Sequence, residues 1–291
     1  MKAELRTAAV GVENRPGETA GNLARIQSAV RRAARAGAEL VLLPELSVTG
    51  FLPNHPEGDH AAWLAEALRG AWACAERMDG AAVAELARMS AVEGVFVAAG
   101  MLEEAEGVLH NTQVLVGEGR VWGRWRKMHV PLFEMPFYNG GEAPVVVETP
   151  LGRIGVNICF DAMLPESTRL LAVQGCEIVL FPFAADPVPG TAAAWAAWAR
   201  PVLRARCAEN GVFGVASNYR GRVAFAGVEQ ALPGGALVVG PDGEMIGEGD
   251  GEMLLAELTA ERLRMARSAF EYTFRFRRPE LYGLLAKPSQ G

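Results

Sequence analysis

A cysteine at a predicted strand-to-helix turn has both the chemistry and the position of a nucleophile. Cys159 follows the apolar run Arg153–Ile158 and precedes an amphipathic segment, Pro165–Gln174, which leads into a second apolar run, Ile178–Pro182. A helix between two apolar strands predicts a βαβ unit with parallel strands. The turn after such a strand is a usual place for catalytic groups, and its backbone N–H groups favour a thiolate and an oxyanion.

Two charged residues end other predicted strands and complement a thiol. Glu45 closes the strand Glu39–Pro44, and Lys127 closes Arg120–Arg126. A thiol nucleophile needs a base that takes its proton and a positive group that stabilises the oxyanion formed on attack. A glutamate and a lysine supply these two roles, and we expect both to converge with Cys159 at one edge of a sheet.

Histidine is the usual base for a cysteine, so the histidines offer alternatives. His129 lies two residues after Lys127, and this spacing leaves open a Cys159–His129 pair, as in a thiol hydrolase or transferase. His55 and His60 enclose Asp59 in a polar loop, which is more typical of a solvated surface than of a metal site. We therefore predict neither a metal nor an organic cofactor.

The composition restricts the classes of partner and the compartment. The 291 residues are 50% hydrophobic and carry a formal net charge of −6, with a pI near 5.4. This balance argues against nucleic acid or an anionic membrane as the main partner. No apolar run approaches the roughly 18–20 residues of a membrane span, and the N-terminus lacks the apolar core of a signal peptide. The four cysteines show no CxxC spacing, so we expect a soluble, cytoplasmic protein.

The order of predicted elements indicates one α/β domain with mixed sheets. Strands and helices alternate through most of the chain, and hairpins dominate its last third. The predicted hairpins join Asn111–Val116 to Arg120–Arg126, Val223–Val228 to Ala236–Val239, and Glu244–Gly247 to Met253–Leu258. The predicted helices are Thr19–Ala36, a part of Leu52–Asp79, Ala81–Val92, Pro165–Gln174, Thr191–Glu209 and one after Thr259.

Three stretches of the chain resemble the signature motifs of the nitrilase superfamily, also called the carbon–nitrogen hydrolases. They are LLPELSVTGF around Glu45, GRWRKMHVP around Lys127 and GVNICFDAMLPE around Cys159. The motifs stand in the family's order, with the cysteine 32 residues after the lysine (159 − 127), and the likeness spans nearly the whole chain. The resemblance implies a four-layer αββα sandwich of two mixed β-sheets over residues 1–270. It also implies a C-terminal arm, 271–291, at an oligomer interface.

The resemblance assigns roles to these residues. Glu45 would be the general base, Lys127 the acid and the cation that stabilises the oxyanion, and Cys159 the nucleophile. Family members often have a second active-site glutamate shortly after the lysine. Glu134 matches that position best, and Glu142 is the other candidate.

The chemistry that these roles imply is the hydrolysis of a carbon–nitrogen bond. The thiol attacks the substrate, and the oxyanion lies against Lys127 and the backbone N–H of Phe160. Loss of ammonia or an amine leaves a thioester on Cys159, which a water activated by Glu45 hydrolyses. No step needs a cofactor.

The residues after the cysteine bear on the substrate. The sequence Cys159-Phe160-Asp161 resembles the amidase pattern of the family, whereas nitrilases usually carry Trp-Glu there. Members that act on carboxylate-bearing substrates often place an arginine three or four residues beyond the cysteine, where this chain has Ala162-Met163. We therefore expect a small neutral or apolar amide, with a nitrile or an N-carbamoyl amide as the alternatives. A non-enzymatic binding scaffold would leave the three motif residues unexplained.

Four aromatic residues lie on stretches that border the substrate pocket in similar proteins: Phe137, Tyr138, Phe183 and Trp195. They favour an apolar pocket, although core packing explains them equally well. The partners expected from the resemblance are a small-molecule amide or nitrile and further copies of the chain in a homodimer or higher homo-oligomer.

Overall fold

Two mixed sheets form the centre of the computed structural model, which describes residues 1–50, 60–187, 189–225, 228–250 and 252–287. The first sheet has six strands in the order β14-β1-β2-β3-β4-β5. Its strands are β1 (Glu4–Val10), β2 (Leu40–Leu42), β3 (Phe96–Ala105), β4 (Val108–Gly117), β5 (Arg120–Arg126) and β14 (Met253–Thr259). The neighbours β1, β2 and β3 are parallel, and antiparallel strands extend both edges.

The second sheet repeats this plan in the order β13-β12-β9-β8-β7-β6. Its strands are β6 (Val146–Thr149), β7 (Gly152–Val156), β8 (Ile178–Phe183), β9 (Phe213–Asn218), β12 (Ala236–Val239) and β13 (Met245–Gly249). The strands β7, β8 and β9 are parallel, with α4 (Pro165–Val173) between β7 and β8. The βαβ unit predicted around Cys159 is therefore confirmed.

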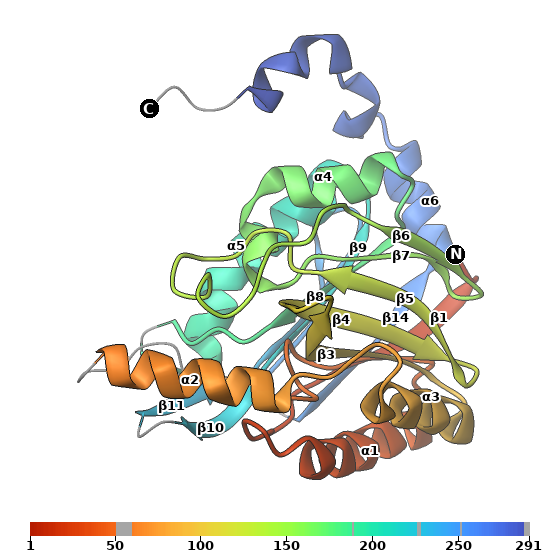
Figure 1. Ribbon diagram of the computed structural model, residues 1–291. Coiled ribbons are helices and arrows are strands. Elements are labelled where there is room, and N and C mark those ends of the chain that lie inside the picture. Colours follow the sequence, from red (N-terminus) through yellow and green to blue (C-terminus); the bar gives the residue numbers. More distant parts are fainter. Residues whose placement is uncertain (51–59, 188, 226–227, 251, 288–291) are drawn as a thin grey trace.

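Helices cover the outer face of each sheet, so the molecule has four layers (Figure 1). The helices α1 (Thr19–Arg35) and α3 (Ala81–Glu93) pack on the first sheet. The helices α4 and α5 (Ala192–Asn210) pack on the second. Apolar side chains of both sheets meet in a core between them, which includes Leu42, Leu180 and Val215. The four-layer αββα sandwich expected from the resemblance is confirmed.

Helical periodicity explains why α1 lies on the sheet. Its buried residues are Asn22, Ile26, Ala29, Val30 and Ala33, whose spacing places them on one face of a helix. That face packs into the same core as β1, β2 and β3. Arg31, Arg32 and Arg35 of the same helix are exposed.

Both hairpins predicted in the last third of the chain are wrong, whereas the hairpin of β4 and β5 is confirmed. A ribbon of β10 (Arg220–Phe225) and β11 (Val228–Pro233) precedes β12, which pairs instead with β9 and β13. The strand β14 pairs with β1 from the opposite end of the sequence. An apolar run identifies a strand but does not select its partner, because the partner is decided by which sheet edge remains open after the layers assemble.

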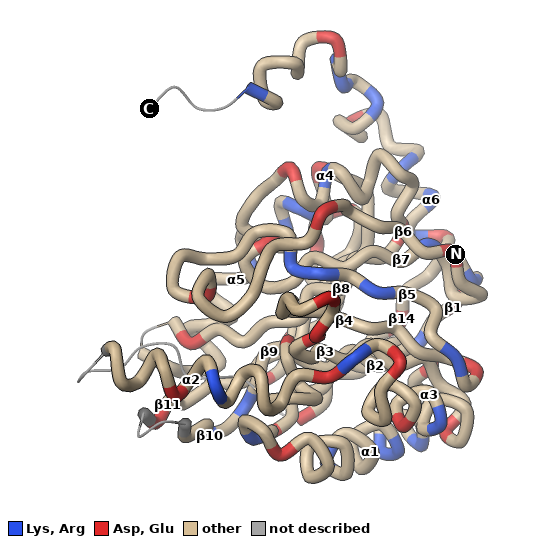
Figure 2. Tube along the Cα trace, in the orientation of Figure 1, with Lys and Arg blue, Asp and Glu red and all other residues tan. Residues whose placement is uncertain are grey.

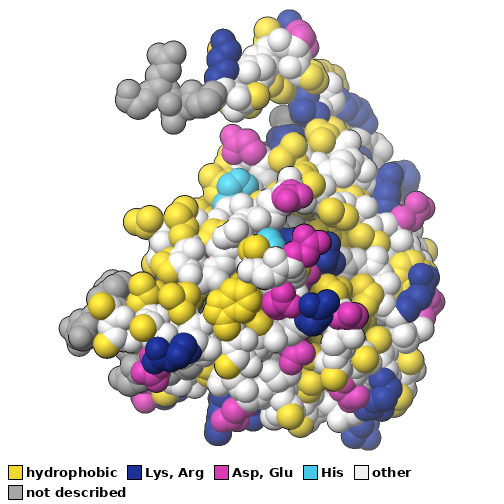
Figure 3. Space-filling view, viewed as in Figure 1, with side chains coloured by type: hydrophobic (Ala, Val, Ile, Leu, Met, Phe, Trp, Pro, Cys, Tyr) yellow, Lys and Arg dark blue, Asp and Glu magenta, His cyan; other side chains and the backbone are white. Residues whose placement is uncertain are grey.

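The helix α2 (His60–Cys74) packs on the β10–β11 ribbon, and α6 (Ala260–Ser268) follows β14. Beyond α6, the short helix η2 (Thr273–Phe276) contacts α5, and η3 (Pro279–Ala286) extends beyond the sandwich, at the top of Figures 1 and 3. Acidic and basic residues are interleaved along the trace in Figure 2. In the described part of the chain, no helix has the length and apolar character needed to cross a membrane.

Candidate active site

The turn after β2 directs Glu45 into the interior. Leu46 adopts a φ of 52°, so the chain bends back at this residue. The N–H of Gly100 on β3 then donates to the Oγ of Ser47 (3.2 Å), which holds the turn against the strand. The side chain of Glu45 has no exposed surface.

Lys127 directly follows β5 and is also completely buried. Its backbone N–H donates to the carbonyl oxygen of Asn111 on β4 (2.8 Å), and its carbonyl accepts from the N–H of Gly141 (2.8 Å). These bonds continue the β4–β5 pairing past the end of the strand and fix the point from which the lysine side chain projects.

A buried carboxylate on β3 anchors the end of β5. Glu103 accepts hydrogen bonds from Arg124 (2.8 Å), from Nε and Nη2 of Arg126 (2.9 and 2.8 Å) and from Thr112 (2.7 Å). Burial opposes its ionisation, but the bonds from Arg126 and Thr112 outweigh that effect and lower the pKa of Glu103. Because Arg126 precedes Lys127, this anchor supports the lysine.

Two carboxylates share the ammonium of Lys127. The Nζ donates to Oε1 of Glu45 (2.9 Å) and to Oε2 of Glu134 (2.5 Å). Burial favours the neutral amine, but the negative charge of Glu45 leads the effects that raise the pKa of Lys127 well above its ordinary value. The lysine is therefore a buried cation, and these contacts use two of its three N–H bonds.

Asn111 and Tyr138 complete the hydrogen bonding of the two carboxylates. The Nδ2 of Asn111 donates to Oε1 of Glu45 (2.6 Å) and to the hydroxyl of Tyr138 (3.3 Å), and that hydroxyl donates to Oε2 of Glu134. The other oxygen of Glu45, Oε2, is buried and has no hydrogen-bond partner among the described residues. The sequence analysis missed Asn111, although a buried amide at the start of an apolar strand was a signal for it.

Cys159 begins a short 3₁₀ helix, η1 (Cys159–Met163), which is separated from β7 by Asn157 and Ile158. Its φ of 47° lies in the left-handed region, which is unusual for a residue other than glycine. Burial and the charge of Glu45 raise the pKa of the Cys159 thiol well above its ordinary value, and Lys127 opposes them. The raised pKa favours the protonated sulfur, so attack requires a base that accepts its proton.

The site lies between the sheets, not at one edge of a single sheet as expected from the sequence. Glu45 and Lys127 follow β2 and β5 of the first sheet, whereas Cys159 follows β7 of the second. The physical reason is that the core between the sheets buries one face of each, which brings the ends of strands from both sheets together.

Asp161 connects the two sheets at this point. Its Oδ1 accepts from the backbone N–H of His129 (2.8 Å), and its Oδ2 accepts from those of Ile158 (3.1 Å) and Met128 (3.3 Å). The segment after the lysine is thus bound to the turn that carries Cys159. Asp161 is itself buried.

Of the alternatives left open by the sequence, His129 and Glu142 take other partners. The Nδ1 of His129 bonds to Oδ1 of Asp161 (2.8 Å) and to Ser167 (3.2 Å), and the bond to Asp161 raises the pKa of the imidazole. The charged groups that act on the Cys159 thiol are carboxylates and the lysine, which favours a carboxylate base. Glu142 is exposed, and its charge acts on Arg126.

The aromatic residues expected at the pocket divide into two pairs. Phe137 and Tyr138 follow Glu134 in the same loop and are nearly buried. Phe183 and Trp195 are completely buried in the core between α5 and the second sheet, with ring centroids 5.7 Å apart. Phe160 is 40% exposed, directly after the cysteine.

Within the described ranges, no group of three or more His, Cys, Asp and Glu side chains is arranged to hold a metal. His55 and Asp59 lie outside the residues that the structure describes, and His60 begins α2.

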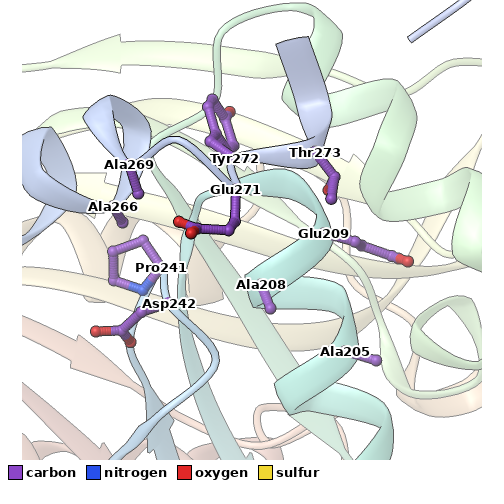
Figure 4. Close-up of a pocket in the computed structure, with 10 residues that line it drawn as sticks. All are labelled: Ala205, Ala208, Glu209, Pro241, Asp242, Ala266, Ala269, Glu271, Tyr272 and Thr273. Atoms are coloured by element: carbon purple, nitrogen blue, oxygen red, sulfur yellow. The ribbon is translucent and has the colours of Figure 1, made fainter. Parts of the chain in front are cut away.

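A groove of about 550 Å³ lies elsewhere on the molecule, between α5, α6 and residues 271–273 (Figure 4). Its lining includes four alanines together with Glu209, Asp242 and Glu271. None of its lining residues belongs to the cluster around Lys127, so it is separate from the candidate active site.

Comparison with known proteins places the chain in a family. The family model described as carbon–nitrogen hydrolase matches residues 6–268. The chain is 29% identical over 268 residues to a nitrilase of Pyrococcus abyssi, covering 90% of this chain and 92% of that protein. It is 28% identical over 274 residues to an (R)-stereoselective amidase of Pseudomonas sp, covering 94% and 90%.

Solved structures agree with this placement. A mutant of the Nesterenkonia AN1 amidase from the nitrilase superfamily matches with a TM-score of 0.74 and 25% identity, covering 96% of this chain and 95% of that one. A carbon–nitrogen hydrolase of Helicobacter pylori G27 has the same fold, with a TM-score of 0.80 at 22% identity over 98% and 99% of the two chains. The chain therefore belongs to the carbon–nitrogen hydrolase family, in the amidase-like branch of the nitrilase superfamily, and is a hydrolase of carbon–nitrogen bonds.

Proposed function

We propose that the protein hydrolyses a small amide to a carboxylic acid and ammonia or an amine, through a thioester on Cys159. The observation that carries the proposal is the buried Glu45–Lys127–Glu134 cluster, whose charges act on the Cys159 thiol. A protonated thiol beside a carboxylate with one unpaired oxygen is the arrangement that base-assisted attack requires.

In the first step, Oε2 of Glu45 accepts the proton of the thiol as the sulfur forms a bond to the amide carbon. The carbonyl π electrons move to oxygen, which becomes an oxyanion. The remaining N–H of Lys127 and the backbone N–H of Phe160 donate to that oxyanion. Removing one such donor lowers kcat by about 10²–10³-fold in comparable sites.

In the second step, the carbon–nitrogen bond breaks, and the proton held by Glu45 goes to the departing nitrogen. The acyl group remains as a thioester on Cys159. Glu45, again ionised, takes a proton from a water molecule that attacks the thioester. The thiolate leaves with that proton, which releases the acid and restores the resting site.

Several features favour a neutral amide as the substrate class. Ala162 and Met163 occupy the positions at which an arginine would bind a substrate carboxylate. The amidase names of similar proteins, including the (R)-stereoselective amidase, favour the same class. The nitrilase of Pyrococcus abyssi keeps nitrile hydrolysis as the second candidate, and the N-carbamoylputrescine amidases keep carbamoyl amides.

Ammonia release from a panel of butyramide, benzamide, an N-carbamoyl amine and butyronitrile tests the proposal. We expect the wild type to hydrolyse the amides fastest, and Cys159→Ala to lose turnover because no thioester can form. Mass spectrometry of the quenched wild type should show the acyl group on Cys159. Turnover that survives Cys159→Ala would contradict the assignment, whatever the activity of His129→Ala.

We further propose that the chain works as a cytoplasmic homo-oligomer whose interface includes the C-terminal arm, residues 271–291. In this arm Phe276, Leu284 and Leu285 are 66%, 71% and 69% exposed. Large apolar side chains exposed in this way are typical of a surface that another chain covers. All four cysteines are free thiols, as in a reducing compartment. Sedimentation equilibrium of the full chain and of a variant with Leu284→Glu and Leu285→Glu tests the interface, and an unchanged mass would contradict it.

A further inference from the structure

We propose that Tyr138 and Asn111 are positioning residues that close a hydrogen-bond ring around Lys127 and thereby assign different tasks to its two glutamates. This inference rests on the proposed function, because the tasks are those of amide hydrolysis. In the ring, Glu45 is the carboxylate that carries the proton, and Glu134 is the carboxylate that stays ionised and holds the lysine in place.

The ring is continuous through five side chains. Asn111 donates to Glu45 (2.6 Å) and to the hydroxyl of Tyr138 (3.3 Å), and that hydroxyl donates to Glu134. Lys127 donates to both glutamates, at 2.9 and 2.5 Å, and so closes the ring. Each member is buried, so water does not compete for these bonds and each one is stronger than at the surface.

Donor and acceptor chemistry fixes the direction of every bond. An ionised carboxylate only accepts, so Asn111 must present its amide nitrogen to Glu45. The Oδ1 of Asn111 is then buried without a partner among the described residues, which costs free energy. The opposite orientation of the amide would not remove that cost, because it would place Oδ1 against the carboxylate of Glu45. The hydroxyl of Tyr138 accepts from Asn111, so its single hydrogen is available for Glu134.

This arrangement separates the two carboxylates. Oε1 of Glu45 faces two donors, Asn111 and Lys127, so a proton arriving from the thiol is directed to the unpaired Oε2. Oε2 of Glu134 faces Lys127 and the tyrosine hydroxyl, both of which stabilise its ionised form.

Glu134 depends on these two donors to remain ionised. Lys127, Glu45, Tyr138 and Cys159 are the titratable groups around it. Burial, the largest effect, and the charge of Glu45 raise the pKa of Glu134 above its ordinary value, and Lys127 and the bond from Tyr138 offset only part of that rise. Without the tyrosine hydroxyl, Glu134 takes up a proton at a higher pH and no longer holds the ammonium as an ion pair.

The first test is the pH profile of kcat/KM for butyramide in Tyr138→Phe, which removes one oxygen atom and keeps the ring. We expect the acid limb to move up by about one pH unit, so that kcat at a pH below both midpoints falls by about ten-fold, with KM nearly unchanged. Tyr272→Phe is the matched control, because it also removes a bonded hydroxyl (3.2 Å to the carbonyl of Asn210) but lies at the distant groove. It should leave both kcat and the acid limb unchanged.

The second test is a double-mutant cycle of Tyr138→Phe and Asn111→Leu, read from melting temperatures. Because both residues belong to one ring, the double variant should lose less than the sum of the single losses, by about 2 °C or more. An acid limb that stays in place in Tyr138→Phe, or additive losses in the cycle, would overturn the proposal. If the wild type releases ammonia from no amide, the proposed function fails, while the melting cycle still reports whether the ring exists.

Discussion

Gly100 on β3 supports the turn that carries Glu45, and its missing side chain makes room for that turn. A Cβ built at this position would lie 2.3 Å from the nitrogen of Leu46, 2.8 Å from Oε1 of Gln113 and 3.0 Å from the carbonyl carbon of Glu45. Ordinary contacts begin at 3.4 Å, so Gly100→Ala must displace the turn by roughly 1 Å. Overpacking of this kind costs about 1–3 kcal/mol, and a 1 Å misplacement near reacting atoms lowers the rate by about 100-fold.

The assay compares kcat/KM for amide hydrolysis with the melting temperature of the same preparation. Gly249→Ala on β13 is the matched control, because its added Cβ would meet only ordinary contacts with Leu254 at 3.7 and 3.8 Å. We expect the control to keep its activity within about two-fold, since nothing must move. A folded Gly100→Ala variant with the kcat/KM of the wild type would refute the reasoning, because Glu45 would then tolerate the displacement.

Two further predictions concern the groups that hold the site together. Glu103→Gln removes the charge between Arg124 and Arg126 and should lower the free energy of unfolding in urea by about 2–3 kcal/mol at neutral pH. Because the folded pKa of Glu103 is lowered, its stabilisation is lost as the pH falls through that pKa, so the difference should shrink in acid. His129→Gln has the opposite pH dependence: the folded pKa of His129 is raised, so its stabilisation is present below its unfolded pKa, about 6.5, and is lost as the pH rises through the folded value. Urea unfolding at pH 5.5 and 8.5 should show the larger loss at pH 5.5, and an equal loss at both values would contradict the role of the His129–Asp161 bond.

The backbone is strained at two points of the candidate active site. Leu46 and Cys159 have φ values of 52° and 47°; the first is next to Glu45, the proposed base, and the second is the proposed nucleophile. Among the residues that the structure describes, Glu106 and Glu118 also have positive φ values, and they lie in the tight turns between β3 and β4 and between β4 and β5. Turns commonly need this conformation, whereas at Leu46 and Cys159 it sets the direction of a side chain in the candidate site. Each such residue costs about 1–3 kcal/mol of folding free energy, which the packing of the surrounding core must offset.

The sequence by itself determined the local structure and the kinds of reactive groups. Periodicity located α1 and the βαβ unit around Cys159, because a buried helix face and a doubly covered strand each leave a pattern within a short stretch. The motifs also identified Glu45, Lys127 and Glu134 as residues of interest, and the structure brings these three side chains together.

Only the tertiary structure decided which strands pair and which side chains complete the cluster. Asn111 lies 66 positions from Glu45 in the chain, yet the two bond at 2.6 Å. No local pattern encodes that contact, because it depends on how β2 and β4 lie in one sheet and how that sheet packs on the other. The same holds for the site's position between the sheets and for the pairing of β14 with β1. Periodicity reports which face of an element is buried, whereas the neighbour that buries it is chosen by the packing of the whole chain.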